Sequence, residues 1–452
     1  MQPITADILL TNAQVVNEGT ITKAHIAIQG GLIKKIIPVD DGLQGVEAKE
    51  TLNLEGLHVF PGVIDDQVHF REPGLTHKGE LYTEARAAVA GGTTTYMEMP
   101  NTVPSATTVD KLEQKYSRAS EVSLANYSFY IGTTNTNIDD VTAINPSNVC
   151  GIKIFMGSST GDMLVDDPIG LENIFKYGQT IITTHCEVDP MVKQSLQHYK
   201  SIYGDNVPVW YHPFIRSREA CLASSRQAIE LASKHNSKLH ILHISTAEET
   251  LLFDNNKPLA EKRITAEACI HHMWFSGADY KTKGNFIKWN PAVKTAYDRD
   301  AIFNAVLENR IDVIATDHAP HTLEEKQQPY LNAPSGGPLV QHSLVAMLDF
   351  YHQGKISLER IAEKMSHNVA ILFQINRRGF IREGYYADLA VVDLNSPNTV
   401  DKSNILYKCG WSPFEGHTFK SAVKHTFVNG NHVYNNGVIN EDTRGMRLTF
   451  NR

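Results

Sequence analysis

The sequence predicts an α/β protein in which a (β/α)8 barrel of the TIM type is joined to a smaller β domain built from both ends of the chain. Three observations support this prediction. The middle of the chain, residues 57–375, alternates short apolar runs with amphipathic segments, as parallel sheets built from βα units do. The terminal segments, 1–56 and 376–452, consist of short β-rich runs separated by Asn, Gly and Asp. A chain of 452 residues is long enough for one large barrel and a second, smaller domain.

The terminal segments are predicted to form one domain because neither holds enough strands to bury a core alone. Residues 32–37 near the start, and residues 388–392 and 422–428 near the end, are typical strand sequences. The sequence NGN at residues 429–431 is typical of a hairpin turn. We therefore expect the two segments to pack together as a discontinuous β-sandwich beside the barrel.

The barrel needs eight strands, and eight segments of the middle region have a suitable length and composition. Helix-like stretches, such as 80–90 and 217–234, lie between them. Eight strands with helical returns favour a closed barrel over an open sheet, and a barrel places its functional residues at the carboxyl ends of its strands. The predicted strands are residues 59–69, 93–99, 127–133, 151–157, 180–187, 238–246, 263–273 and 312–320.

The composition is that of an ordinary soluble globular protein, with 42% hydrophobic and 20% charged residues. A net charge of -8 without a basic stripe argues against nucleic acid and anionic membranes as partners. No apolar run reaches about 18 residues, and the N-terminus lacks a signal pattern. Five cysteines without close pairing suit a reducing cytoplasm. We therefore expect a cytoplasmic protein with no nucleic-acid or membrane partner. The sequence leaves open whether the protein forms a homodimer.

The first predicted strand carries the most distinctive stretch of the chain, PGVIDDQVHFREPG at residues 61–74. Side chains alternate between the two faces of a strand, so Asp65, Gln67 and His69 are expected to point the same way. The closing Pro-Gly pair ends the strand and places these side chains near its carboxyl end, with Arg71 just beyond. The structural alternative is a core strand that ends in polar residues without a functional role.

A lysine interrupts the fourth strand, where Lys153 lies within the apolar run IKIFMG at residues 152–157. Barrel strands are buried on both faces, so a lysine there is costly unless it is neutralised or paired. The ordinary outcome for a single lysine on a strand is an ion pair, or a side chain that extends to the surface.

Three further strands end in side chains of the kind that bind metals. His185 ends the fifth strand and His243 the sixth, while ATDHAPH at residues 315–321 ends the eighth. Either histidine alone is more often a buried structural residue than a ligand. Together they are expected to line one mouth of the barrel with Lys153 and Asp317, because the carboxyl ends of all barrel strands meet at the same face.

These motifs resemble those of dihydroorotases within the amidohydrolase superfamily of metal-dependent hydrolases. The resemblance is carried by residues 61–74, 152–157 and 315–321, and by MPNT at residues 99–102. It extends from the N-terminal β segment through SPFEG at residues 412–416, and so covers nearly the whole chain.

Two stretches depart from the family pattern. Gln67 stands where the family has the first histidine of a His-x-His pair, and NPAVK at residues 290–294 replaces the usual NPPLR. Zinc favours imidazole, thiolate and carboxylate ligands over a neutral amide. We therefore expect Gln67 to be a weak ligand or no ligand.

The resemblance implies a zinc centre with one or two ions per chain, in which the side-chain nitrogen of Lys153 is carboxylated and its carbamate bridges the ions. Two imidazoles with one oxygen donor leave an open position on zinc, which is the pattern of a catalytic site. The resemblance also implies that Asp317 is both a metal ligand and the catalytic acid/base. The implied metal ligands are His69, Lys153, His185, His243 and Asp317, and the implied substrate-binding residues are Arg71, Asn101, Asn290 and His321.

Dihydroorotase activity is the function that the resemblance implies: reversible hydrolysis of (S)-dihydroorotate to N-carbamoyl-L-aspartate in de novo pyrimidine biosynthesis. Arg71, Asn101 and His321 match the positions that hold the carboxylate of the substrate, and an arginine fork suits a carboxylate. The nearest alternative is a hydantoinase or allantoinase, which shares the metal ligands but acts on a neutral ring. A non-catalytic scaffold subunit is the remaining alternative, and only Gln67 favours it.

Overall fold

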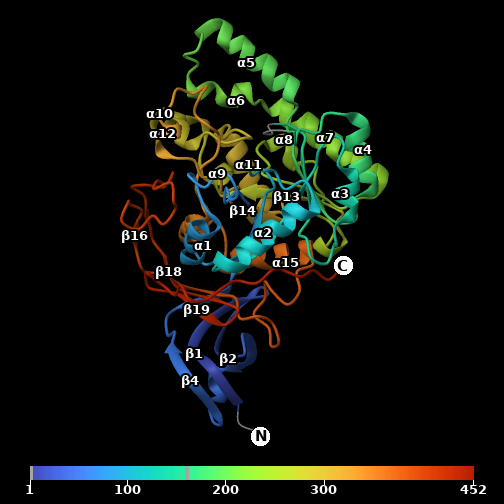
Figure 1. Cartoon of the computed structure of the whole chain (residues 1–452). Helices are drawn as coiled ribbons and strands as arrows, with labels where there is room; N and C mark the ends of the chain where they lie inside the picture. The colour runs from blue at the N-terminus through green and yellow to red at the C-terminus, as the bar shows by residue number, and fades with distance from the viewer. Residues whose placement is uncertain (1–3, 158–161) are drawn as a thin grey trace.

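The barrel strands lie in two groups of parallel strands that follow the order of the chain. The structure is a computed structural model that describes residues 4–157 and 162–452, and the whole chain is drawn in Figure 1. Its two groups of barrel strands are β6-β7-β8 and β9-β10-β11-β12-β13-β14. A parallel bridge between Val68 and His318 joins the first group to the end of the last strand. Tyr130 alone separates β8 from β9, so these two segments make one strand and the predicted eight-stranded barrel is confirmed. The barrel segments are β6 (Val63–Val68), β7 (Thr93–Glu98), β8 (Asn126–Phe129), β9 (Ile131–Gly132), β10 (Ile152–Phe155), β11 (Ile182–His185), β12 (Leu239–Ile241), β13 (Ile264–Cys269) and β14 (Val313–Ala315).

Strands from both ends of the chain are hydrogen bonded into one nine-stranded sheet, in the order β20-β19-β18-β15-β5-β1-β2-β3 with β4 beside β1. A shared core that includes Val15, Ile26 and Leu389 stabilises this sheet. The prediction of a β-rich domain from both chain ends is thus confirmed. Its boundaries at 56 and 375 stay predictions, and residues 1–3 lie outside the described part. The strands are β1 (Ile4–Asn17), β2 (Thr20–Gln29), β3 (Leu32–Pro38), β4 (Val46–Asn53), β5 (His58–Pro61), β15 (Leu389–Asp393), β18 (Ala422–Val428), β19 (Asn431–Asn435) and β20 (Val438–Ile439), and a separate pair is β16 (Asn398–Thr399) with β17 (Thr418–Phe419).

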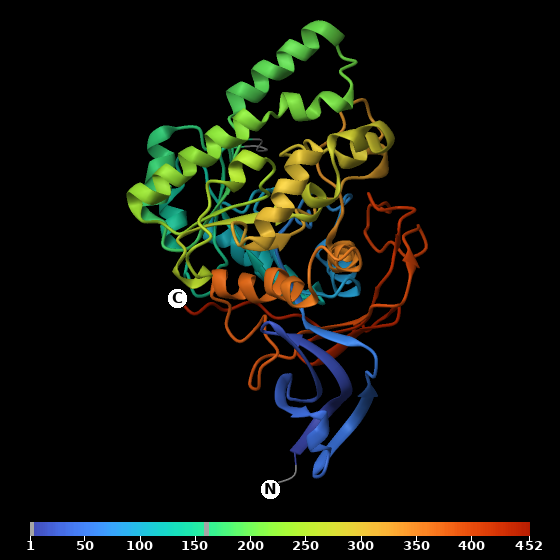
Figure 2. The same ribbon diagram turned by 180° about the vertical axis from the view of Figure 1, so that it is seen from behind.

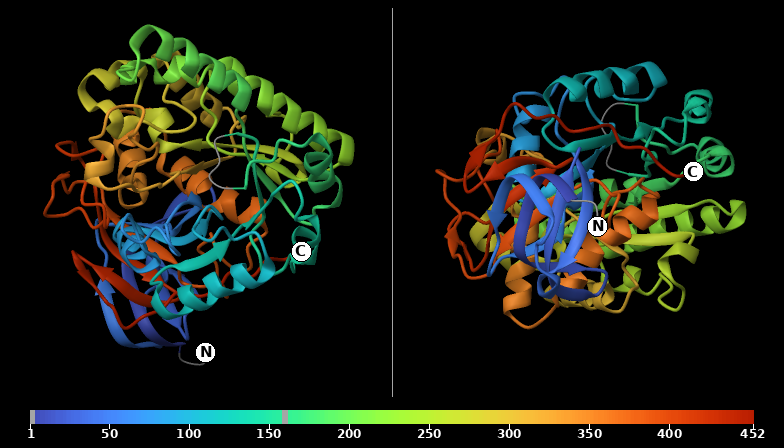
Figure 3. Two further views of the ribbon diagram at one scale, coloured as in Figure 1. Left: turned by 45° about the horizontal axis from the view of Figure 1, so that its top comes forward. Right: turned by 90° about the horizontal axis from the view of Figure 1, so that it is seen from below.

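The helices surround the barrel, and the N-terminal strands lie beneath it, at the end opposite α5 and α6 (Figures 2 and 3). The predicted helical stretches 80–90 and 217–234 correspond to α1 and α7. The hydroxyl of Ser217 caps α7 by accepting a hydrogen bond from the backbone N–H of Ala220 at 3.3 Å. The helix ends at Asn236 in the left-handed conformation, which asparagine tolerates. None of the described helices combines the length and apolar character needed to cross a bilayer.

The helices that have α geometry in the described part of the chain are α1 (Leu81–Ala90), α2 (Val109–Val122), α3 (Ile138–Ala143), α4 (Pro168–Tyr177), α5 (Asp189–Tyr203), α6 (His212–Ile215), α7 (Arg218–His235), α8 (Ala247–Thr250), α9 (Ile270–Trp274), α10 (Tyr280–Lys283), α11 (Ala296–Leu307), α12 (Leu323–Lys326), α13 (Ser343–His352), α14 (Leu358–Ala362) and α15 (Asn368–Phe373).

Gly62 divides the first predicted strand, residues 59–69, into two strands of different sheets. β5 pairs with β15 in the terminal sheet, whereas β6 pairs with β7 in the barrel. The chain changes sheets where there is no room for a side chain, because a Cβ on Gly62 would lie 2.1 Å from Oγ1 of Thr94. The N–H of Gly62 donates to the carbonyl oxygen of Asp388 at 2.8 Å, which ties the junction to the C-terminal segment.

The seventh predicted strand, residues 263–273, is shorter than expected. β13 ends at Cys269 and helix α9 begins at Ile270, so His271 and His272 lie on a helix rather than on a strand. The ring of His271 stacks on that of Trp289 with centroids 4.4 Å apart. The stacked rings contact each other within the core.

Candidate active site

Two side chains from the end of β6 meet Asp317, which follows β14. The amide Nε2 of Gln67 donates to Oδ1 of Asp317 at 3.2 Å, and Nε2 of His69 lies 3.1 Å from the same oxygen. Nδ1 of His69 lies 2.7 Å from Oδ1 of Asn101. An amide oxygen only accepts, so Nδ1 carries the proton and Nε2 of a neutral His69 directs a lone pair at the carboxylate. Burial raises the pKa of Asp317 to about 7, an effect that the charge of Lys153 opposes.

A second group forms where β11 and β12 end. Nδ1 of His185 lies 3.1 Å from Nε2 of His243, and Nε2 of His185 lies 2.8 Å from Oε2 of Glu187. The carboxylate of Glu187 also forms an ion pair with Arg216. Since a carboxylate accepts, the proton of His185 is on Nε2, and its Nδ1 lone pair faces His243. The carboxylate of Glu187 thus orients the His185 ring so that its Nδ1 lone pair is available to a positive group on the side of His243.

Lys153 lies within β10, paired in register with Thr183 of β11, and is only 1% exposed. Its Nζ lies 4.6 Å from the centre of the Phe155 ring. Burial lowers the pKa of Lys153 to about 8, and the charges of Asp317 and Glu267 partly oppose this. An amine with a lowered pKa is a better nucleophile toward carbon dioxide, because more of it is uncharged at neutral pH.

The positive charge of Lys153 lowers the pKa of all three histidines among the predicted metal ligands. Burial is the main cause of the lowered pKa of His69, His185 and His243, and Lys153 contributes in each case. The structure therefore brings together the predicted ligands from β6, β10, β11, β12 and β14. The lone pair of His69 is directed at the carboxylate of Asp317, and this meeting of two acceptors in a water-poor site fits a divalent cation.

Arg71 and His321 lie side by side at the edge of this group. Nη2 of Arg71 is 3.0 Å from Nε2 of His321, and Nε of Arg71 donates to the carbonyl oxygen of Pro320 at 3.0 Å. Arg71 is 7% exposed, and burial lowers its pKa to about 10. No carboxylate in the described part of the chain forms an ion pair with Arg71. A buried guanidinium of this kind is suited to an anionic ligand.

Three of the predicted site residues have a left-handed backbone. The φ angles are 73° at Arg71, 39° at His243 and 48° at Asp317. This conformation costs about 1–3 kcal/mol for a residue that is not glycine, and it is concentrated at functional sites. The surrounding barrel holds these side chains in positions that the local sequence does not favour.

Among the residues that the structure describes, Asn290 forms no hydrogen bond with the other predicted site residues. It is half-buried, and its Oδ1 has no hydrogen-bond partner among the residues that the structure describes. Its place in substrate binding, like the metal and substrate roles of the other residues, stays a prediction.

Several buried polar residues of the barrel were given no role in the prediction from the sequence. Glu187 could have been found from its position two residues after His185 at the end of a strand. Asp65 accepts a hydrogen bond from the Thr316 hydroxyl at 2.5 Å, which fixes the strand before Asp317. The remaining members, for which single positions gave no signal, are Asp66, His240 and Glu267.

Comparison with known proteins supports a shared family. The model of the amidohydrolase family matches residues 223–433, and that of the dihydro-orotase-like family matches residues 56–249. The chain is 32% identical to a dihydroorotase of Halobacterium salinarum, over 86% of this chain and 89% of the relative. A dihydroorotase of Methanothermobacter thermautotrophicus is 30% identical over 96% of each chain. An allantoinase of Desulfitobacterium hafniense is 29% identical over 98% of each chain.

Solved structures share the whole architecture. The L-hydantoinase (dihydropyrimidinase) of Arthrobacter aurescens superimposes with a TM-score of 0.90 and 25% identity, over 96% of this chain and 97% of that one. These findings confirm a hydrolase that acts on cyclic amides, in a family that is typically metal-dependent. With about a third of its residues identical to curated relatives over most of both chains, the protein belongs to the amidohydrolase family, in its dihydro-orotase-like branch.

Proposed function

We propose that the protein is a dihydroorotase that reversibly hydrolyses (S)-dihydroorotate to N-carbamoyl-L-aspartate in de novo pyrimidine biosynthesis. The observation that carries this proposal is Arg71, a buried guanidinium beside His321 without a carboxylate partner among the described residues. Dihydroorotate brings a carboxylate to that position, whereas the rings of hydantoin and allantoin are neutral. The identity to two archaeal dihydroorotases over most of the chain supports the same substrate.

We further propose that the site holds zinc, one or two ions per chain, with Lys153 carboxylated on its side-chain nitrogen. The proposed ligands are His69, Lys153, His185, His243 and Asp317, and the orientation of Gln67 makes it a weak ligand at best. The carbamate would convert a buried ammonium into an oxygen donor among the imidazoles. A bound divalent ion supplies Lewis acidity, which polarises the ring carbonyl and acidifies water.

Each proposed role follows from the position of a residue. Asp317 takes a proton from the water as its oxygen forms the new C–O bond with the ring carbonyl carbon. It then returns that proton to the ring nitrogen, which leaves as the C–N bond breaks. Arg71, with His321 beside it, receives the substrate carboxylate. Asn101 lies next to His69 and adds a hydrogen-bonding group, and the free Oδ1 of Asn290 is available to accept an N–H of the ring. Orientation of this kind lowers the barrier by several kcal/mol in favourable cases.

Hydrolysis of a neutral ring is the second candidate function. The allantoinase of Desulfitobacterium hafniense and the L-hydantoinase of Arthrobacter aurescens match this chain along nearly its full length. The two candidates differ in the group that binds Arg71, because a neutral ring leaves the guanidinium without an anion.

The five cysteines are all free, which supports the proposed cytoplasmic location.

The test is to assay the purified protein, supplied with zinc and bicarbonate, against dihydroorotate, hydantoin and allantoin in parallel. We expect dihydroorotate to have the highest kcat/KM, with ring closure of N-carbamoyl-L-aspartate at acidic pH. A higher kcat/KM for allantoin or hydantoin would contradict the proposal. Absence of turnover by metal-loaded protein with all three substrates would favour the scaffold alternative.

A further inference from the structure

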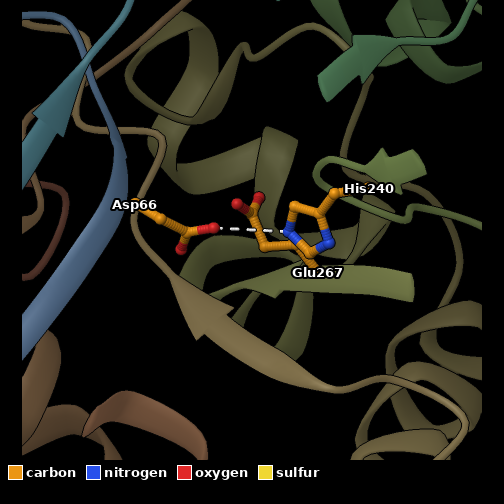
Figure 4. Close-up of side chains that lie close together, drawn as sticks. All are labelled: Asp66, His240 and Glu267. Atoms are coloured by element: carbon orange, nitrogen blue, oxygen red, sulfur yellow. Dashed lines mark ion pairs between the residues drawn. The ribbon is translucent and has the colours of Figure 1, made fainter. Parts of the chain in front are cut away.

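A second group of metal-binding side chains lies inside the barrel, apart from the residues described above. Asp66 of β6, His240 of β12 and Glu267 of β13 are each 0% exposed. One ligand atom from each lies within 4.8 Å of the others, and the three side chains point toward one another (Figure 4). Oδ2 of Asp66 is 3.3 Å from Nε2 of His240. Three strands thus contribute one oxygen or nitrogen donor each.

The hydrogen bonds of His240 fix which ring nitrogen carries a proton. Nδ1 lies 2.9 Å from the hydroxyl oxygen of Thr265, and that hydroxyl donates to the carbonyl oxygen of Leu239 at 3.2 Å. Because the hydroxyl proton is used there, the oxygen of Thr265 accepts from Nδ1–H. The Nε2 of a neutral His240 therefore directs a lone pair at Asp66, so two acceptors face each other.

The carboxylates have oxygen atoms left over at the same point. Oε1 of Glu267 accepts from the backbone N–H of His243 at 2.8 Å and from the thiol of Cys269 at 3.2 Å. Oε2 of Glu267, both carboxylate oxygens of Asp66 and Nε2 of His240 have no hydrogen-bond partner in the described part of the chain. These buried atoms are directed into the space that the three residues share.

The charge of this group also requires a partner. Two carboxylates removed from water are destabilising unless they are protonated or meet a cation. None of the ion pairs among residues 4–157 and 162–452 joins a lysine or arginine to Asp66 or Glu267. A divalent ion would balance two negative charges and satisfy the lone pair of the imidazole.

We propose that Asp66, His240 and Glu267 bind one divalent transition-metal ion, with zinc preferred, at a site separate from the catalytic residues. The imidazole disfavours calcium and magnesium, which select oxygen donors, while a nitrogen with two carboxylates suits zinc. The ion would join β6, β12 and β13 across the barrel. Through Glu267 it would also hold the backbone of His243, so its role is to position that residue.

Metal analysis of variants tests the proposal. A chain with His185→Asn and Asp317→Asn lacks two of the five proposed catalytic ligands but retains the second site. After dialysis with a weak chelator, we expect it to hold about one zinc ion per chain. Adding Asp66→Asn should remove that ion. The control is Asp312→Asn, because Asp312 is a carboxylate at 2% exposure that is paired with Lys262 instead of facing a free imidazole. Retention of the ion after Asp66→Asn, or no ion before it, would overturn the proposal.

A second measurement on the unmutated protein removes any dependence on how the variants fold. Crystals grown with zinc and measured at its absorption edge should give an anomalous peak between Asp66, His240 and Glu267. A clear peak at the catalytic residues without one at this group would overturn the proposal, and would leave a shared proton as the link between Asp66 and His240.

Discussion

The two halves of the proposed catalytic site are built from different side chains. The imidazole half consists of His185 and His243. Its His185 donates to Glu187, which in turn forms an ion pair with Arg216. The amide half, Gln67, His69 and Asp317, has a neutral Asn101 behind His69. The amide group of Gln67 donates to Asp317 and so uses an oxygen that a metal would need. If two ions bind as proposed, one side-chain difference at Gln67 is enough to make their positions unequal.

Removing the group that both halves share should have the largest effect. Lys153→Ala should lower kcat by about a thousandfold or more at ambient carbon dioxide, because the proposed bridging carbamate could not form. Excess of a small carboxylic acid should restore part of the activity. Lys364→Met is the matched control, since Lys364 is also fully buried but donates to the carbonyl oxygen of Ile311. An unmodified ammonium seen at high resolution in fully active, metal-loaded protein would contradict the carbamate.

The next effect concerns the substrate rather than the metal. Arg71→Met should reduce kcat/KM for dihydroorotate at least about a hundredfold, because charge-assisted hydrogen bonds to the carboxylate are lost. A neutral ring such as hydantoin should be affected much less. Arg118→Met serves as the control, because Arg118 is half-exposed and pairs with Glu72 near the same loop. Equal proportional losses on both substrates would remove the argument for carboxylate binding.

Restoring an imidazole to the amide half should make the halves alike. Gln67→His, made in an Asp66→Asn chain so that only catalytic ions are counted, should raise tightly held zinc from about one to about two per chain. Both proteins would be dialysed identically and analysed for metal. If the chain with Gln67 already holds two catalytic ions equally firmly, the amide does not weaken its half.

The smallest effect on zinc binding should come from changing Glu187, the residue that orients His185 in the imidazole half. Glu187→Gln keeps a hydrogen-bond acceptor for His185 but removes the charge, and should weaken zinc binding about tenfold. Competition with a chromophoric chelator measures this. Glu172→Gln is the matched control, because Glu172 pairs with His235 far from the barrel mouth. Unchanged zinc affinity in Glu187→Gln would show that the charged pair does not act on the metal.

The barrel and the meeting of its strand ends could be predicted from the sequence. Apolar runs of suitable length mark buried parallel strands, and topology alone then brings Lys153, His185 and Asp317 to one face. The place where β6 begins could not be predicted, because the break at Gly62 depends on contact with Thr94, a residue of the next strand. Such tertiary contacts leave no periodic signal along the chain.

The inward direction of Asp66 could not be predicted either. Strict alternation groups Asp65 with Gln67 and His69 and assigns Asp66 to the other face. The register of β6 against β7 is irregular between Asp65 and Val68, so alternation does not hold there. The contact of Asp66 with His240 also links residues far apart in the chain, which single-position reasoning does not detect.

The pairing of β5 with β15 has a consequence for the order in which the protein can mature. The segment His58–Pro61 leads directly into β6, but its partner Leu389–Asp393 is made more than three hundred residues later. During synthesis at about 5–20 residues per second, the edge of β5 stays open for tens of seconds. The other edge of β5 pairs with β1, which is made earlier, so the segment that leads to Gln67 is held on one side only until the ribosome has nearly finished, and a prematurely terminated chain would lack the second partner.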